Sequence, residues 1–391
     1  MSVAVFVLLV SLAGVAYAYL GYPLAIAARA RLAPRPLHRE PAALPTVSIV
    51  VIAHDAMPAL AAKLANLDAL DYPPELLEFV VASDGSRDGT AQLLRDAREP
   101  RLKALVFPAR RGKSACLADA IAAATGEIIV FTDVRQQLEH GALRALAAAL
   151  ADPDVGCASG ELRFRERAAT GRPGYAASVG AYWRYEKWLR RNESRSGSVV
   201  GVTGAIYAAR RALLPAVPPG IVLDDVYVPM AIAMRGARVV FEPGAVAWDE
   251  PSADAASEAR RKRRTLAGNY QLVAAMPALL DPRRNPLWLR FVSHKLMRLA
   301  APWLLLAAFV ANLALFDQAP GWAALFVLQA AGYALALAGV LSARLRTLLP
   351  VRLAATFLEM NAYAALALFD WLSGRDLHLW RGAAPAREAT R

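Results

Sequence analysis

Acidic residues stand at the ends of apolar runs, where a buried strand would deliver them to a site. Asp84 and Asp133 each close such a run, and the adjacent Asp224 and Asp225 follow another. A carboxylate in the place of Asp84 can accept a hydrogen bond from a nucleobase N–H. Adjacent carboxylates repel when both ionise, so Asp224 or Asp225 can serve as a general base. The competing interpretation of this pair is a helix N-cap.

The stretch FTDVRQ raises the question of a metal. A second aspartate two residues after Asp133 would form a pair able to hold a divalent ion, but Arg135 occupies that place. Mg²⁺ in proteins often uses one or two carboxylates, with substrate phosphates and water as its other ligands. We therefore expect Asp133 to hold Mg²⁺ or Mn²⁺ only together with a substrate. The alternatives are that Arg135 takes over part of the phosphate charge or that it points away.

Further candidate residues lie beside these carboxylates. Lys113 stands near an expected helix start, where its ammonium can hold a phosphate, although a solvated basic turn is the competing interpretation. His54 and Asp55 follow the first apolar run and belong to the same expected crevice. Gly201 and Gly204 are explained by close approach of a ligand to the backbone or by a tight turn.

The elements that must position these residues alternate between strand and helix. Buried strands alternating with helices predict a mostly parallel sheet covered on both faces, in which ligands bind beyond the carboxyl ends of the strands. The fold class is therefore α/β. The expected strands are Val47–Ala53, Leu77–Ser83, Arg101–Phe107 and Glu127–Asp133, and the expected helices between them are roughly Met57–Leu70, Thr90–Glu99 and Lys113–Ala124.

Long uncharged segments flank this α/β region. The chain is 57% hydrophobic with a mean hydropathy of +0.31, which is too apolar for an ordinary soluble domain. Residues 1–28 carry no charge and are followed by arginines, which predicts an N-terminal anchor with a cytoplasmic basic flank; a cleaved signal peptide is the less favoured alternative. The expected division is an anchor at 1–28, a catalytic domain at 46–250, basic interfacial helices at 251–298, transmembrane segments at 299–372 and a tail at 373–391.

The number of C-terminal spans stays open. Segments 299–316 and 321–343 are uncharged and long enough to cross a bilayer, whereas 353–369 contains Glu359 and Asn361. Four spans would place the tail outside, yet the tail carries Arg375, Arg381, Arg387 and Arg391. Either the positive-inside rule fails here, or one apolar segment lies in the membrane interface.

Charge and cysteine usage limit the partners. The net charge is +12, and much of it lies in the run 260–264 and in basic residues between 283 and 298. Because this basic region leads directly into an apolar segment, we expect it to meet anionic membrane lipids or substrate phosphate, and we expect no nucleic acid. Only Cys116 and Cys157 occur, so a disulfide framework is not expected and a reduced cytoplasmic domain is.

The order of these motifs resembles glycosyltransferase family 2, the membrane-embedded GT-A enzymes that include cellulose, chitin and hyaluronan synthases. The resemblance covers Val47 to about Arg298. It rests on VASDGSRDGT, on GKSACLADAIAAATGEIIVFTDV, on VTGAIYAARR, on LDDVYVP in the place of the catalytic TED, and on RKRRTLAG in the place of QxxRW.

The resemblance implies a role for each residue. Asp84 would hold the uracil of a UDP-sugar, Asp133 would approach the ribose or diphosphate through metal, and Lys113 would face the nucleotide. Asp225 would be the base that deprotonates the acceptor hydroxyl for an inverting displacement. Arg264 matches the arginine of QxxRW, Arg261 stands in place of its glutamine, and Gly204 lies in the acceptor-side segment.

The implied function is transfer of a sugar from a UDP-sugar to a glycan or lipid-linked acceptor at the cytoplasmic face of the inner membrane. Two departures weaken the match to the processive synthases: the tryptophan of QxxRW is Thr265 here, and Arg135 replaces the second metal carboxylate. The alternative from another class is a catalytically inactive membrane scaffold that binds nucleotide-sugar or lipid. Four retained residues speak against that alternative: Asp84, Lys113, Asp133 and Asp225.

Overall fold

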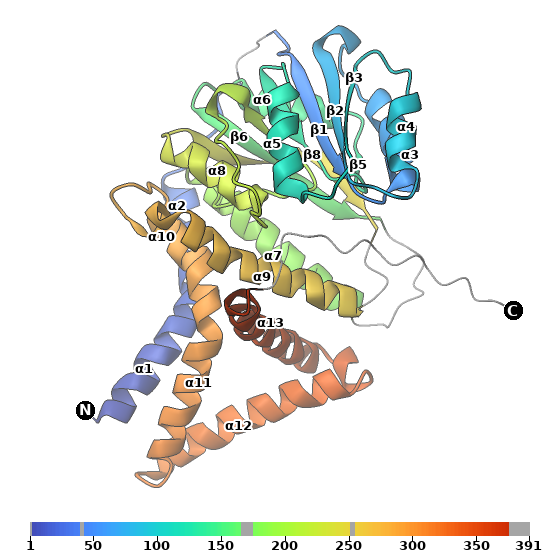
Figure 1. The fold of residues 1–391 in the computed structure, drawn as a ribbon. Coiled ribbons are helices and arrows are strands. Elements are labelled where there is room, and N and C mark those ends of the chain that lie inside the picture. Colours follow the sequence, from blue (N-terminus) through green and yellow to red (C-terminus); the bar gives the residue numbers. More distant parts are fainter. Residues whose placement is uncertain (1, 40–42, 166–174, 251–254, 375–391) are drawn as a thin grey trace, which may run out of the picture. The chain divides into compact units, whose positions relative to one another are not determined.

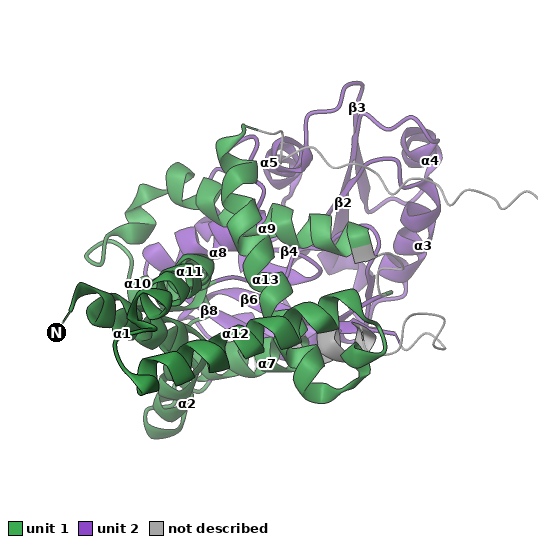
Figure 2. Ribbon diagram, turned by 90° about the horizontal axis from the view of Figure 1, so that it is seen from below, with its two compact units in different colours: residues 1–36, 166–200, 250–375 green, residues 37–165, 201–249, 376–391 purple. Residues whose placement is uncertain are grey.

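The computed structural model describes residues 2–39, 43–165, 175–250 and 255–374 (Figure 1). Most of the expected tail, residues 375–391, lies outside the described residues. The chain forms two compact units, coloured separately in Figure 2. We name residues 37–165, 201–249 and 376–391 the sheet unit, and residues 1–36, 166–200 and 250–375 the helical unit. The expected boundaries at 46 and 250 stay a prediction.

The sheet unit is built on one eight-stranded sheet in the described part of the chain, in the order β3-β2-β1-β4-β7-β6-β8-β5. Within the sheet, β1 pairs parallel with β2 and β4, β2 pairs parallel with β3, and β6 pairs parallel with β8. Strand β7 is antiparallel to its neighbours β4 and β6, and β5 is antiparallel to β8. The strands are β1 Val47–Ala53, β2 Leu77–Asp84, β3 Leu102–Phe107, β4 Ile128–Phe131, β5 Gln137–Leu138, β6 Val155–Phe164, β7 Tyr207–Arg210 and β8 Arg238–Asp249. The expected mostly parallel sheet is confirmed, and the fourth strand ends two residues before Asp133.

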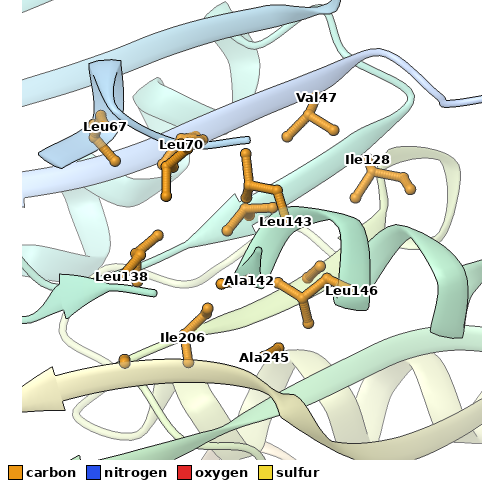
Figure 3. Packing of buried hydrophobic residues seen from close by; sticks show 14 of the residues in the cluster. Val47, Leu67, Leu70, Ile128, Leu138, Ala142, Leu143, Leu146, Ile206 and Ala245 are labelled. Carbon is orange, nitrogen blue, oxygen red and sulfur yellow. The ribbon is translucent and has the colours of Figure 1, made fainter. Parts of the chain in front are cut away.

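Helices cover both faces of the sheet, as the unbroken burial of β1 requires. The helices of this unit are α3 Met57–Asp68, α4 Thr90–Asp96, α5 Lys113–Ala123, α6 Ala142–Leu150 and α8 Asp224–Met234. α3 and α6 pack with alternate residues of β1, such as Val47, in the large apolar core, part of which is seen in Figure 3. The intervening residues Val50 and Ile52 face Leu117 of α5 on the other side.

The helical unit contains the apolar segments. Its helices are α1 Val3–Ala16, α2 Tyr22–Leu32, α7 Tyr175–Arg195, α9 Ala255–Ala275, α10 Trp288–Phe291, α11 Met297–Leu315, α12 Pro320–Leu341 and α13 Leu349–Leu372, with π-helical segments at Tyr17–Gly21 and Val292–Leu296. Among the described residues, three helices are long and apolar enough to cross a membrane: Val3–Leu32, Trp288–Leu315 and Pro320–Leu341.

The fourth apolar segment forms α13 but does not belong to that set. Two of its charged residues, Glu359 and Asp370, have partners within the helical unit. Arg346 donates two hydrogen bonds of 2.6 Å to Glu359, and Arg263 of α9 donates hydrogen bonds of 2.9 and 2.7 Å to Asp370. Trp371 stacks on Tyr270 of α9. One edge of α13 therefore carries charged side chains.

A buried ion cluster joins the helices around His294. Its Nδ1 lies 2.8 Å from Oε1 of Glu193 and its Nε2 lies 2.9 Å from Oε1 of Glu186, so the ring lies between two buried carboxylates. Glu186 also accepts a hydrogen bond from Arg298. Burial alone would raise the pKa of Glu186, but the charges of His294 and Arg298 outweigh it and hold this pKa well below its ordinary value.

Replacement of His294 by glutamine is expected to destabilise the detergent-solubilised protein by about 3–5 kcal/mol, because two buried carboxylates lose the partner that lies between them. The measurement is thermal unfolding followed by an intrinsic fluorescence signal. Arg284→Gln, at an exposed position of the same unit, is the control and should leave the melting temperature nearly unchanged. Equal melting temperatures for His294→Gln and the control would contradict the role assigned to the cluster.

Candidate functional site

Lys113 stands at the centre of the candidate site. It is the first residue of α5, and its Nζ lies 3.1 Å from Oδ1 of Asp133 and 3.3 Å from Oδ2 of Asp224. Burial by itself disfavours the charge on Lys113. The carboxylates of Asp133, Asp224 and Asp225 outweigh that effect and raise the pKa of the lysine above its ordinary value. The structure thus brings together residues that are more than 100 positions apart in the sequence.

Gly204 lies against two of these carboxylates. A Cβ atom at this position would stand 3.5 Å from Oδ2 of Asp225 and 3.9 Å from Oδ2 of Asp133. Both oxygens therefore border the small space above the glycine. The backbone N–H of Val202 donates a 2.9 Å hydrogen bond to the carbonyl of Asp225, which ties this loop to the start of α8. A small cavity lined by Lys113, Asp133, Gly204 and Asp224, among others, continues beneath the site.

The two neighbouring aspartates of α8 differ in their surroundings. The carboxylate of Asp224 is buried and paired with Lys113, whereas Asp225 is half-buried and directed toward Gly204. A general base must reach the proton that it abstracts. The geometry therefore favours Asp225 for that task and Asp224 as the anchor of Lys113.

Asp84 is almost fully buried at the end of β2. Its Oδ1 accepts a 2.6 Å hydrogen bond from the N–H of Arg111, and its Oδ2 accepts a 2.9 Å bond from the N–H of Gly112. Gly85 follows with φ +60°, and a Cβ there would stand 2.4 Å from the nitrogen of Arg110. Asp84 and Gly85 thus hold the loop that places Lys113. Recognition of a nucleobase by Asp84 stays a prediction.

His54 and Asp55 hold the loop after β2. Nδ1 of His54 lies 2.6 Å from the carbonyl oxygen of Asp84. Oδ1 of Asp55 accepts a 2.7 Å hydrogen bond from the N–H of Arg87, and its own N–H donates to the hydroxyl of Ser86. Asp55 has φ 45°, an unusual backbone conformation for a residue other than glycine. Nucleotide binding by this pair stays a prediction.

Arg135 has a partner away from the central carboxylates. Its guanidinium donates a 2.8 Å hydrogen bond to Oδ2 of Asp249 at the end of β8, and Gln136 donates to the same oxygen. The carboxylate of Asp249 is buried, so loss of Arg135 would remove a positive charge that offsets its negative charge. Of the two alternatives for Arg135, this geometry favours the one in which it points away from the donor phosphates.

The fit of a divalent metal can be judged from Asp133. Lys113 engages Oδ1, and Oδ2 is directed toward the space above Gly204. The described residues contain no group of three or more His, Cys, Asp or Glu side chains placed to hold a metal. One carboxylate oxygen fits a Mg²⁺ or Mn²⁺ site whose other ligands are phosphate and water oxygens. The residues present thus fit a metal that arrives with its substrate.

Lys63 is a buried lysine beneath this site that the sequence analysis passed over. It lies in α3 at the core-facing spacing of Leu60 and Leu67, and its side chain has no exposed surface. Burial lowers the pKa of Lys63 to about 7, and the negative charge of Asp133 opposes that shift. A lysine at a core position of an amphipathic helix was the signal in the sequence.

Arg261 and Arg264 lie in α9 of the helical unit, and their part in donor binding stays a prediction. Arg261 donates a hydrogen bond to Glu258, one turn earlier in the same helix. Both cysteines, Cys116 and Cys157, are free and buried.

The fold and the site together have the arrangement of a ligand-binding α/β domain. Acidic and basic side chains meet at the carboxyl ends of parallel strands, where such sheets bind their ligands. Residues 45–268 match the family described as "Glycosyltransferase like family 2". The chain therefore belongs to glycosyltransferase family 2, as its motifs predicted, and the GT-A fold class is confirmed.

Among the relatives are an N-acetylglucosaminyltransferase of Rhizobium meliloti, 30% identical over 197 residues, and the poly-beta-1,6-N-acetyl-D-glucosamine synthase of Staphylococcus aureus, 25% identical over 194 residues. Each match covers 47% of this chain, and it covers 43% and 45% of the respective relative. A mannosyltransferase from Pyrobaculum calidifontis, solved in complex with GDP-Man and Mn²⁺, is similar with a TM-score of 0.70 and 26% identity, covering 94% of this chain and 99% of that one.

Proposed function

We propose that the protein is an inverting glycosyltransferase that moves a sugar from a nucleotide-sugar, in particular a UDP-sugar, to a glycan or lipid-linked acceptor at the cytoplasmic face of the membrane. The observation that carries the proposal is the convergence of Lys113, Asp133, Asp224 and Asp225 at the carboxyl end of the sheet. Family membership and the fold shared with a mannosyltransferase support it.

The proposed reaction follows from the charges. The acceptor hydroxyl oxygen attacks the anomeric carbon of the sugar while the bond from that carbon to the nucleoside diphosphate breaks on the opposite side. Asp225 takes the proton of the attacking hydroxyl. Lys113, held by Asp224, stabilises the negative charge of the departing diphosphate. A divalent metal bound at Asp133 would supply further positive charge for the diphosphate.

The donor is the first quantity to measure. The curated relatives are named for N-acetylglucosamine, and the similar solved structure holds GDP-Man. The protein in lipid nanodiscs is incubated with UDP-GlcNAc, UDP-Glc, UDP-Gal and GDP-Man, each with Mn²⁺, and nucleoside diphosphate release is followed. We expect release from a UDP-sugar. Release from GDP-Man alone would contradict the proposed UDP-sugar donor and would leave the assignment as a glycosyltransferase unchanged.

The inactive scaffold is the alternative. It rests on Arg135 and Thr265, which depart from the family motifs. Tight binding of a nucleotide-sugar with no release from any donor, in the presence of acceptor lipid or oligosaccharide, would support the scaffold and contradict the transferase.

The membrane arrangement that we propose has three spans. With the basic flank of the first span inside, Trp288–Leu315 leads outward and Pro320–Leu341 returns. α13 then lies in the cytoplasmic interface, and the arginine-rich tail is cytoplasmic. This arrangement satisfies the positive-inside rule at every basic segment, which four spans do not. The basic helices α9 and α10 would meet anionic lipid headgroups on the same side.

Cysteine labelling tests this arrangement, because both natural cysteines are buried and give little background. In intact spheroplasts, a membrane-impermeant maleimide is expected to label Asp317→Cys and not Thr347→Cys or Ser373→Cys, all of them exposed positions. Permeabilisation should make the last two reactive. Labelling of Ser373→Cys in intact spheroplasts would show that α13 crosses the membrane.

A further inference from the structure

Lys63 donates its hydrogen bonds to the turn that carries Asp133. Its Nζ lies 2.9 Å from the hydroxyl of Thr132 and 2.6 Å from the carbonyl oxygen of Gln136. These two residues flank the turn on either side, and Asp133 lies between them. The Nζ atom of Lys63 thus joins the two ends of the turn, and the lysine side chain is fully buried.

The hydroxyl of Thr132 extends this contact to the acceptor-side segment. It accepts from Lys63 and donates a 2.8 Å hydrogen bond to the carbonyl oxygen of Ala205. Ala205 follows Gly204, where an added Cβ atom would stand 3.5 Å from Oδ2 of Asp225 and 3.9 Å from Oδ2 of Asp133. One chain of hydrogen bonds therefore runs from α3 through the Asp133 turn to the segment beside Gly204.

Asn66, one turn further along α3, is hydrogen-bonded to the end of the segment that follows Asp133. Its side-chain amide donates to the carbonyl of Leu138 at 2.9 Å, and its oxygen accepts from the N–H of Leu138 at 2.7 Å. Lys63 and Asn66 are three residues apart and so share one face of the helix. That face is hydrogen-bonded to the segment 132–138 at Thr132, Gln136 and Leu138.

The burial of Lys63 is unusual for its residue type. An ammonium is costly to bury, and an apolar side chain of similar length would fill the space without that cost. Lys63 lies in α3 between the core residues Leu60 and Leu67, and both hydrogen bonds of its Nζ end on the segment that carries Asp133. A costly buried group whose contacts all lie beneath a site is best explained by the site.

We propose that Lys63 is a positioning residue for nucleotide-sugar binding. By joining the Asp133 turn to the Gly204–Ala205 segment, it sets the carboxylate of Asp133 in the place that the donor diphosphate and its metal require. This inference rests on the proposed function. Residues that orient ligand-holding groups typically change affinity by about 10–100-fold when they are replaced.

The test compares Lys63→Met with the full-length wild-type protein in nanodiscs. Lys103→Met, which removes a half-buried lysine paired with Glu78 in the same unit, is the matched control. The measurements are the melting temperature without ligand, the dissociation constant of the nucleotide-sugar with Mn²⁺, and KM for donor and acceptor. We expect Lys63→Met to melt at or above the wild-type temperature, to bind donor about 10-fold more weakly, and to keep the acceptor KM.

Unchanged donor affinity in Lys63→Met would overturn the inference, whatever its melting temperature. A lowered melting temperature with equal losses for donor and acceptor would show a general structural role and would also overturn it. If Lys63→Met does not fold, Thr132→Val serves instead, because it removes the hydroxyl link and keeps a branched side chain; it must weaken donor binding selectively. Absence of donor binding in the wild type would defeat the proposed function itself, which separates the two failures.

Discussion

Asp225→Asn is expected to lower sugar transfer by about 10²–10⁴-fold while donor binding survives. The amide has nearly the shape of the carboxylate but cannot take the proton of the acceptor hydroxyl. The loss should therefore appear in kcat and not in the donor KM. The measurement is the rate of transfer at saturating donor, together with the dissociation constant of the donor.

Asp224→Asn is the matched variant on the neighbouring residue. Because the carboxylate of Asp224 lies 3.3 Å from the ammonium of Lys113, loss of its charge should weaken the hold on that ammonium. We expect a raised donor KM with a smaller effect on kcat. Near-normal turnover in Asp225→Asn combined with an inactive Asp224→Asn would transfer the base role to Asp224.

Removal of the metal is expected to abolish transfer, and Asp133→Ala should have the same effect. The departing diphosphate develops negative charge, and a divalent ion offsets that charge without a proton transfer. Lys113 supplies one positive charge near Asp133 and is itself held by two carboxylates. Activity is measured after treatment with a chelator and after return of Mg²⁺ or Mn²⁺, and Mn²⁺-dependent donor binding is measured in parallel.

Asp96→Ala, at an exposed position of α4, is the control for Asp133→Ala and should keep full metal-dependent activity. Full activity of the wild type in excess chelator would refute the metal hypothesis. It would then leave Lys113 as the principal positive charge near the diphosphate, since Arg135 is paired with Asp249.

The elements of the sheet unit could be predicted closely from local patterns. The strand at Val47–Ala53 has the predicted bounds, and Lys113 begins a helix as expected. Both follow from short-range information, because a buried parallel strand must be apolar along its whole length. The same rule located Asp84 and Asp133 at the edge where ligands bind.

The sequence by itself determined the family, the kind of sheet and the acidic residues at its carboxyl edge, because these are encoded by contiguous motifs. Only the tertiary structure decided which charges meet. Arg135 pairs with Asp249, 114 positions away, and Lys63 reaches Thr132 from another helix. By its sequence alone, α13 is an apolar segment. The structure shows that its Asp370 pairs with Arg263 of α9. Ion pairs between distant residues depend on how elements pack, and a local pattern of residue types carries no information about that packing.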